Sequence, residues 1–322
     1  MRTVKKLLKF LFPKLYNRLI VNKIEKRFRN CKDLKQTIKK DYKAAFNVDL
    51  NLDNPVTFYE KVNYLKMYQN DYSFSNFVDK VSAKELAKSF SKEIIVSKLI
   101  CTFDTFKAFS SSFRKKELPP VFVAKLNHTS GDVYFFNNGI WRDKKGHNIS
   151  QRIVFANLKA MIDLNYYHTS FEKCYDQIKR RILIEEYLPS VKGLDEYKVF
   201  CNYGEPKMVN VVYGRQDGDG VKEVFADDKL KILPVNQGLK LIESGKVYKP
   251  KCWESMIEFA KKASAGKPML RVDMLTDGNN FYFCEFTFYD FAGMSIFYPL
   301  EWNSIIGDKF DLRDFEKIPT IN

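Results

Sequence analysis

The segment that most constrains the fold is RVDMLTDGNNFYFCEFTFYD, at residues 271–290. Two apolar runs flank DGNN at 277–280, a strong turn signal, so the segment predicts a β-hairpin. The second run is almost wholly aromatic, yet it holds Glu285, and the first run holds Asp273. A strand built for burial therefore keeps a carboxylate at its centre, and a buried carboxylate needs a partner.

Asp273 and Glu285 share one face of this hairpin only if the loop has an odd number of residues. We expect a three-residue loop, 278–280, which sets the two carboxylates opposite each other, with Arg271 and Thr287 beside them. Facing carboxylates repel, and burial raises the cost. A divalent cation removes both problems, and Mg²⁺ prefers such oxygen ligands. The alternative is a salt bridge between Arg271 and one carboxylate, with the other solvated.

Composition limits the class of protein. The chain has 322 residues, 45% hydrophobic and 15% aromatic, enough for a sizeable core in two domains, or in one large domain with an appendage. The six cysteines show no CxxC spacing and only three histidines are present, which argues against a zinc site or a disulfide framework. The cysteine pattern favours a reduced, cytoplasmic protein. The sequence contains no run of 18 apolar residues, so it predicts no transmembrane helix.

The positive charge is concentrated at the N-terminus. Residues 1–43 hold 15 Lys and Arg but only 3 Asp and Glu, within a chain of net charge +15. Apolar residues recur at helical spacing on both sides of Pro13, which predicts a basic amphipathic helical arm that is broken there. Such an arm suits an anionic membrane surface. The alternatives are a solvated helix packed on the body or a protein-binding helix; no nucleic-acid motif accompanies the charge.

The rest of the chain mixes helices and strands, which predicts an α+β fold. Strands are expected at 121–142, with a turn at Asn137-Asn138-Gly139, and a hairpin in EYKVFCNYGEPKMVNVVY. Helices are expected at 151–180 and in WESMIEFAKKASAG, which ends at Gly266. We divide the chain into the arm at 1–43, a helical region at 44–112, and two α+β parts at 113–188 and 189–322.

Lys125 ends an apolar strand and precedes a small polar loop, Asn127–Gly131. Such a loop can fold over phosphates and offer backbone N–H groups while the lysine supplies charge. An ordinary hairpin with a solvated lysine would look the same, and His128 is as easily a structural loop residue as a ligand.

Glu185 and Glu186 follow a short buried strand in RILIEEYL. The backbone here could bind an adenine edge, with Leu188 as an apolar wall, or it could be a simple polar strand end. Lys198 lies on the next strand, where it could face phosphates or extend to water.

In their order, these segments resemble ATP-grasp enzymes, in particular the teichuronopeptide-biosynthesis (TupA-like) branch, from about Phe58 to Trp302. VFVAKLNHTSG is similar to FVLKxNHGSG, and EYKVFCNYGEPK to DYKFFCFNGKPK. NYYHTSFEKCYDQIKRRILIEEYL is similar to NYY…E…Y…IKPRIxxEEYL, and RVDM…YFCEFTFYDFAG to RVD…ELTFYPGSG. The chain departs from these patterns at Thr129 and Asp132, which replace glycines, at Thr287, where many members have Asn, and in DFAG at 290–293, which replaces PGSG.

The resemblance implies an ATP-grasp fold, in which two α+β subdomains clasp ATP, here with the basic arm attached. It implies that the nucleotide is bound by Lys80, Lys125, Ser130, Gly131, Glu185, Glu186, Tyr187, Leu188 and Lys198. Mg²⁺ would be held by Asp273, Glu285 and Thr287, and Arg271, together with Lys198, would act at the transferring phosphoryl group.

The resemblance further implies ATP-dependent carboxylate–amine ligation through an acyl-phosphate. The branch suggests that an amine or amino acid is joined to a hexuronic acid of a bacterial surface polysaccharide, such as a capsule, or of its lipid-linked precursor at the inner leaflet. The segment 214–251 would cover the acceptor site, with Arg215 as a substrate contact. Two alternatives stay open: a catalytically silent glycan-binding or scaffold protein at the membrane, and a glycan kinase on the same fold.

Overall fold

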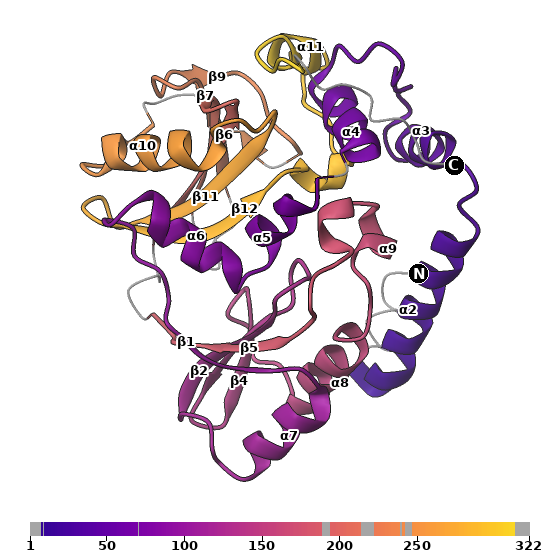
Figure 1. Ribbon diagram of the computed structural model, residues 1–322, viewed down its shortest axis with the longest axis vertical. Helices are drawn as coiled ribbons and strands as arrows, with labels where there is room; N and C mark the ends of the chain where they lie inside the picture. The colour runs from indigo at the N-terminus through magenta and orange to yellow at the C-terminus, as the bar shows by residue number, and fades with distance from the viewer. Residues whose placement is uncertain are drawn as a thin grey trace.

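Two β-sheets organise the molecule, and helices α5 (Ser75–Val78) and α6 (Ser82–Phe90) lie between them in Figure 1. The computed structural model describes Leu8 and residues 10–69, 71–188, 194–213, 222–238, 240–241 and 247–312. The mixture of helices with largely antiparallel sheets confirms the predicted α+β class.

The five-stranded sheet is antiparallel, with the order β1-β5-β2-β3-β4. Its strands are β1 (Leu99–Phe103), β2 (Val121–Leu126), β3 (Val133–Asn137), β4 (Ile140–Asp143) and β5 (Ile182–Glu185). Asn138 and Gly139 both have positive φ, 45° and 91°, and form the two-residue turn expected between β3 and β4. β1 comes from the region predicted to be mainly helical, and it pairs with β5 at the sheet edge.

The seven-stranded sheet has the order β10-β8-β7-β6-β11-β12, with β9 paired to β8. Its strands are β6 (Asp195–Asn202), β7 (Glu205–Tyr213), β8 (Lys222–Ala226), β9 (Ile232–Leu233), β10 (Lys240–Leu241), β11 (Leu270–Thr276) and β12 (Phe281–Thr287). The predicted β6–β7 hairpin forms, and its turn residues Tyr203 and Gly204 have φ of 48° and 87°. Because β11 pairs with both β6 and β12, residues far apart in the sequence share one face at the sheet edge.

Helices α7 (Phe106–Arg114) and α8 (Gln151–Met161) cover the five-stranded sheet. Phe109 and Leu158 are buried with Phe122 of β2 in a core separate from that of the larger sheet. The chain also contains helix α3 (Leu34–Phe46) and the short elements η1 (Tyr72–Phe74), α9 (Tyr167–Ser170), η2 (Lys173–Tyr175) and η4 (Asp290–Gly293). Helices α7 and α8 thus cover the outer side of the five-stranded sheet, and this sheet forms the second wall of the space between the sheets.

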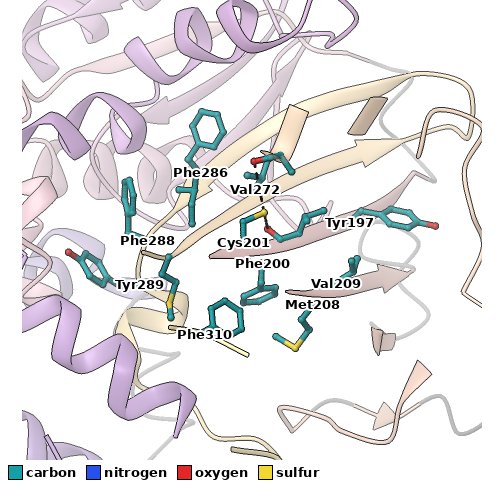
Figure 2. Close-up of a cluster of buried hydrophobic side chains, with 14 of the residues drawn as sticks. Tyr197, Phe200, Cys201, Met208, Val209, Val272, Phe286, Phe288, Tyr289 and Phe310 are labelled. Atoms are coloured by element: carbon teal, nitrogen blue, oxygen red, sulfur yellow. Dashed lines mark hydrogen bonds between the residues drawn. The ribbon is translucent and has the colours of Figure 1, made fainter. Parts of the chain in front are cut away.

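Both faces of the larger sheet are packed. Helix α10 (Trp253–Ser264) covers one face, and α4 (Phe58–Tyr68) with α11 (Trp302–Gly307) belongs to the core of the other. Figure 2 shows Phe286 on one side of the strands and Phe200, Met208 and Phe310 on the other. The Phe58 ring of α4 lies 6.0 Å from that of Phe200. Apolar side chains therefore pack against both faces of this sheet.

Helix α2 (Pro13–Arg29) forms most of the described arm, after a break at Phe12. It runs beside α8 and α9 (Figure 1). Asn17 Nδ2 donates to Asn157 Oδ1 at 2.6 Å, and Glu25 Oε1 lies 2.9 Å from His168 Nδ1. One side of the arm is thus fixed to the body. In the described part of the chain, no helix combines the length and apolar character that crossing a bilayer requires.

Candidate functional site

Two adjoining cavities lie between the sheets, with volumes of about 410 Å³ and about 720 Å³. The larger has apolar walls at Val123, Phe135, Leu188 and Leu275. The cavities meet at a common wall formed by Lys80, Lys84, Lys125, Lys144, Phe283, Cys284 and Glu285. Four lysines and one carboxylate line this common wall, and Glu185 of the larger cavity adds a second carboxylate, so positive charge predominates and favours an anion.

The predicted hairpin forms as β11 and β12, with Asp273 opposite Glu285 and Arg271 opposite Thr287. The expected odd-residue loop is wrong, because Thr276 pairs with Phe281 and leaves four residues, 277–280, in the turn. A β-bulge restores the register: Asp273 pairs with Glu285 but the next residue pairs with Phe283, so that Cys284 is the extra residue.

The bulge also answers why an aromatic strand keeps a carboxylate. The Phe259 ring of α10 contacts the rings of Phe281, Phe283 and Phe286 at 6.1, 6.3 and 6.0 Å. An unbroken alternation would place Phe283 and Phe286 on opposite faces. Because the extra residue precedes Glu285, the rings turn towards α10 while Glu285 stays across from Asp273.

Arg271 lies among the residues expected to bind the cation. Its Nε and Nη2 donate to the two oxygens of Asp273 at 2.7 Å each, and its Nη1 donates to Asp290. Its Nη2 also lies 3.4 Å from Glu285 Oε1 and 3.2 Å from the Thr287 hydroxyl. Burial alone would lower the Arg271 pKa, but Asp273 and Asp290 raise it well above its ordinary value. Arg271 thus forms the salt bridge to Asp273 that the sequence left open, and it also contacts Glu285.

Lys125 and Lys84 share one buried carboxylate. Their ammonium groups lie 2.7 and 3.2 Å from Glu185, whose side chain is 2% exposed. Burial lowers the pKa of Lys84 to about 8, and the nearby Lys125 lowers it too. Burial would raise the Glu185 pKa, but the two lysines hold it below its ordinary value. The pair of ammonium groups is thus fixed at the junction of the cavities.

Lys80 supports the polar loop Asn127–Gly131 by a hydrogen bond to its backbone. The Lys80 ammonium donates to the carbonyl of Thr129 at 2.5 Å, and burial lowers its pKa. Ser130 lines the smaller cavity, and Gly131 has a φ of +92° that favours glycine. Lys80, expected to contact phosphate, thus supports the loop while also lining both cavities.

His128 is a structural residue of the same loop. Its ring lies 3.1 Å from Asn127 Oδ1 and 3.2 Å from the Met161 carbonyl oxygen. Burial lowers its pKa to about 4. The ring is therefore neutral near pH 7, and its single N–H can donate to one of these two oxygens.

The segment after β5 lines the larger cavity, but its residues differ in what they offer. The Glu185 carboxylate binds lysines, and its backbone pairs with β1 and β2. The N–H of Glu186 donates to the Lys98 carbonyl at 2.9 Å. The Tyr187 ring contacts Phe135, at 5.7 Å, and Leu188 forms part of the wall. An adenine hinge here would therefore use groups other than the Glu185 side chain and the Glu186 N–H.

Lys198 faces the hairpin carboxylates from β6. It pairs with Asp273 across the strands, and its ammonium lies 3.9 Å from Asp273 Oδ2. It lines the smaller cavity with Arg271 and Glu285, as predicted for residues of one face. Arg215, the predicted substrate contact, lies outside the described residues.

The departures from the family pattern are also visible. Asp132 accepts a 3.4 Å contact from the Tyr134 hydroxyl. Phe291 and Ala292, in η4, have φ of 47° and 56° and line the smaller cavity. Left-handed backbone at residues with side chains is a form of strain that persists at ligand sites.

Several residues of the smaller cavity were missed from the sequence, among them Lys84, Lys144, Tyr166 and Glu172. Lys84 lies four residues after Lys80, in the first turn of α6, and this nearness to a predicted phosphate contact could have identified it. Glu172 lies within the segment that resembles the family, and it is buried at 6% exposure. Lys144 and Tyr166 carry no local signal, because only the tertiary fold brings them to the cavity.

The donor set fits a divalent cation held with the help of phosphates. The described residues contain no cluster of three or more His, Cys, Asp or Glu side chains that could hold a metal on their own. Glu285 is 43% exposed at the junction, whereas both oxygens of Asp273 are bonded to Arg271. Mg²⁺ is commonly held by one or two carboxylates plus substrate phosphates. Glu285 suits this role directly, and Asp273 would join it only after Arg271 released it.

Known structures give only distant similarity. D-alanine–D-alanine ligase from Helicobacter pylori has 13% identity and a TM-score of 0.38, over 73% of this chain and 61% of that one. The Bacillus anthracis D-alanine–D-alanine ligase has 15% identity and a TM-score of 0.36, over 73% and 65%. The macrocyclase MdnC from Microcystis aeruginosa, bound to its precursor peptide MdnA, has 12% identity and a TM-score of 0.33, over 86% and 68%. The chain spans less than two thirds of either ligase.

A comparison with curated proteins found no match. The family models give a clear assignment, because the TupA-like ATP-grasp model matches residues 60–311. This range includes both sheets and all the described residues that line the cavities. The chain belongs to the TupA-like ATP-grasp family.

Proposed function

We propose that this protein is an ATP-dependent ligase that joins a carboxylate to an amine through an acyl-phosphate. The observation that carries the proposal is the junction of the two cavities, where Lys80, Lys84 and Lys125 meet Glu285. The apolar larger cavity suits a nucleoside, and the lysine-lined junction suits its phosphates. Family membership supports the same assignment.

In this proposal Lys125 and Lys198 hold phosphate oxygens, and the backbone of Ser130 and Gly131 covers them. Arg271, which lines the smaller cavity, neutralises negative charge on the acyl-phosphate. Bound Mg²⁺, held by Glu285 with Asp273 and Thr287, would neutralise the phosphates and polarise the transferred group. Positioning and electrostatics then supply the rate enhancement without a covalent enzyme nucleophile.

For the substrates, we propose a hexuronic acid of a bacterial surface polysaccharide or its lipid-linked precursor as the carboxylate, and an amino acid or simple amine as the nucleophile. The support is the family branch, together with a basic arm suited to a membrane-bound precursor. Arg215 is proposed to contact the acceptor.

The test is a two-stage assay. Binding of Mg·ATP should raise the melting temperature, and ADP should then be released only when both a uronic acid and an amine are present. Glu285→Gln should abolish both effects, whereas Glu258→Gln, an exposed change on α10, should abolish neither. ADP release without an amine, with a phosphorylated sugar as product, would support a glycan kinase instead. Neither a thermal shift nor turnover would overturn the ligase and favour a silent scaffold.

We also propose that α2 binds the anionic inner leaflet of the cytoplasmic membrane. The side of α2 turned away from the body carries apolar residues, among which Leu15 and Leu19 are 49% and 50% exposed. Lys14, Arg18 and Lys23 are exposed among them. This combination suits insertion of apolar side chains at an anionic surface, with about 1 kcal/mol from each nearby basic residue.

Vesicle flotation tests the arm. The full chain should float with vesicles of phosphatidylglycerol and phosphatidylcholine and not with phosphatidylcholine alone. Leu15→Glu combined with Leu19→Glu should abolish flotation. Asn22→Glu, an exposed change on the same helix, adds negative charge without removing an apolar side chain and should weaken it only slightly. Equal flotation of the double variant would remove the membrane proposal and leave a protein-binding or merely solvated helix.

A further inference from the structure

The smaller cavity extends beyond the residues that serve the nucleotide. Lys80, Lys125 and Glu285 line both cavities, and the proposed function puts the phosphates at this junction. Glu172 and Tyr166 line only the smaller cavity. The smaller cavity therefore has a second region, next to the phosphate positions and away from the nucleoside, where a co-substrate could meet an acyl-phosphate.

Glu172 is the unexpected charge in this region. The cavity wall is otherwise cationic, with Lys80, Lys84, Lys125, Lys144, Lys198 and Arg271, and Glu285 is its other acid. A carboxylate beside phosphates is unfavourable unless it meets a cation. Glu285 has a reason to be there, because it suits Mg²⁺. Glu172 has no such role in the nucleotide site. A positively charged group of the second substrate would therefore be a suitable partner for its carboxylate.

The surroundings of Glu172 leave it available for this role. It follows the left-handed residue Phe171 at the start of η2, and its carboxyl group bonds to the Ser170 hydroxyl. The nearest basic side chain on α4, Lys66, donates instead to the Ala292 carbonyl at 2.6 Å. Lys66 thus braces the strained η4 backbone while its charge acts on Glu172 electrostatically.

The charged and titratable groups around Glu172 come from several elements. Burial is the main influence, and it raises the pKa of Glu172 to about 7. The charge of Glu285 also raises this pKa, whereas Ser170, Lys66 and Arg271 lower it. The Glu172 charge is in turn felt by Tyr166, Cys174, Tyr175 and Tyr289. A carboxyl group that titrates near neutral pH is suited to accept a proton during turnover and to release it afterwards.

We propose that Glu172 binds the ammonium group of the amine co-substrate and removes its proton. This inference rests on the proposed ligase function. The Glu172 carboxylate takes one proton from R–NH₃⁺ and becomes a carboxylic acid. The freed nitrogen lone pair attacks the acyl-phosphate carbonyl carbon, a C–N bond forms, and the C–O bond to phosphate breaks with its electron pair on phosphate. The second nitrogen proton passes to the departing phosphate, and Glu172 returns its proton to water.

Hydroxylamine separates this role from the rest of the reaction, because it is largely neutral near pH 7 and attacks acyl-phosphates without a base. The experiment compares wild type, Glu172→Gln, Glu172→Asp and the exposed control Glu93→Gln. Each is supplied with Mg·ATP, a panel of uronic acids, and either glycine and simple alkylamines or hydroxylamine. Amide product, acyl-hydroxamate and ADP are quantified, and folding is checked by melting temperature.

We expect Glu172→Gln to lose about 100-fold or more of its amine-dependent kcat while hydroxamate formation stays within about threefold of wild type. Glu172→Asp should recover part of the amine activity, and Glu93→Gln should match wild type. Equal amine activity in Glu172→Gln would overturn the proposal. Loss of both products in a Glu172→Gln variant would also overturn it, since the residue would then be structural. If wild type itself yields neither product, the ligase function fails, and this inference fails with it.

Discussion

Glu185→Gln probes how the lysines at the cavity junction are held. The Glu185 carboxylate is 2% exposed and lies 2.7 Å from the Lys125 ammonium and 3.2 Å from that of Lys84. Glutamine keeps the size of the side chain and removes its charge. Two ammonium groups would then remain close together, largely buried, without their shared counter-charge.

The magnitude follows from burial. Removing one partner of a buried ion pair costs about 3–5 kcal/mol, because the other charge is left uncompensated. Lys84 is 8% exposed but Lys125 is 17% exposed, so water screens part of the loss. We expect a decrease of about 3 kcal/mol in the free energy of unfolding. At about 2 °C per kcal/mol, the low end of the range for large domains, this lowers the melting temperature by about 6 °C.

The pH dependence adds a second measurement. The pKa of Lys84 in the folded protein is about 8, below its ordinary value of 10.5. Between about pH 8 and pH 10.5, Lys84 keeps its proton in the unfolded chain but has released it in the folded protein. The free energy of unfolding of the wild type therefore rises with pH in this range. Once Lys84 is neutral, its ammonium charge no longer needs Glu185 as a counter-charge. The deficit of Glu185→Gln should therefore narrow as the pH is raised from 7 to 10.

The assay is guanidinium unfolding of the full chain without nucleotide, followed by circular dichroism, at pH 7 and at pH 10. Glu186→Gln is the matched control, because its side chain is exposed and next in sequence, and it should behave as wild type. A Glu185→Gln protein within about 0.5 kcal/mol of wild type, the ordinary range for surface changes, would refute the reasoning. So would a deficit that does not depend on pH.

Three further changes test other parts of the fold. The pKa of His128 is about 4 in the folded protein against 6.5 ordinarily, so stability should fall by about 3 kcal/mol as the pH falls from 6.5 to 4, and His128→Asn should flatten this slope in denaturant titrations. Asn202→Ala removes an amide that donates to the Asp311 carbonyl at 2.8 Å and to a second buried carbonyl, so it should cost about 2–3 kcal/mol in urea unfolding; a loss below about 0.5 kcal/mol would contradict the bonding. Gly307→Ala would place a Cβ atom 2.2 Å from the Val56 carbonyl oxygen, so overpacking should cost about 1–3 kcal/mol; an unchanged melting temperature would contradict it.

The sequence alone determined the hairpins and the family. Alternating apolar runs with turn residues predicted the hairpins, because turn preference and side-chain alternation act between neighbours along the chain. Asn138-Gly139 forms a turn where one was expected, and Tyr203-Gly204 forms the turn of the hairpin expected in EYKVFCNYGEPKMVNVVY. The position of Asp273 opposite Glu285 was also predicted, although by way of the wrong loop length.

The hairpin shows what the tertiary structure decided. A four-residue loop and a bulge at Cys284 give the same pairing as an odd-residue loop, so spacing could not separate them. Packing against Phe259 of α10 makes the difference, because three rings must face that helix while Glu285 faces away. Such a choice depends on an element outside the hairpin.

The ion pairs of the cavities were decided in the same way. Glu185 was predicted as part of an adenine hinge, but the sheet order brings its carboxylate to Lys84 and Lys125 from other elements. Arg271 was predicted to face a phosphoryl group, and the fold surrounds it with Asp273 and Asp290. Local pattern determines which residues become strands and turns, since it reflects neighbours in the chain. Which charges meet depends on sheet order and burial, which only the folded chain defines.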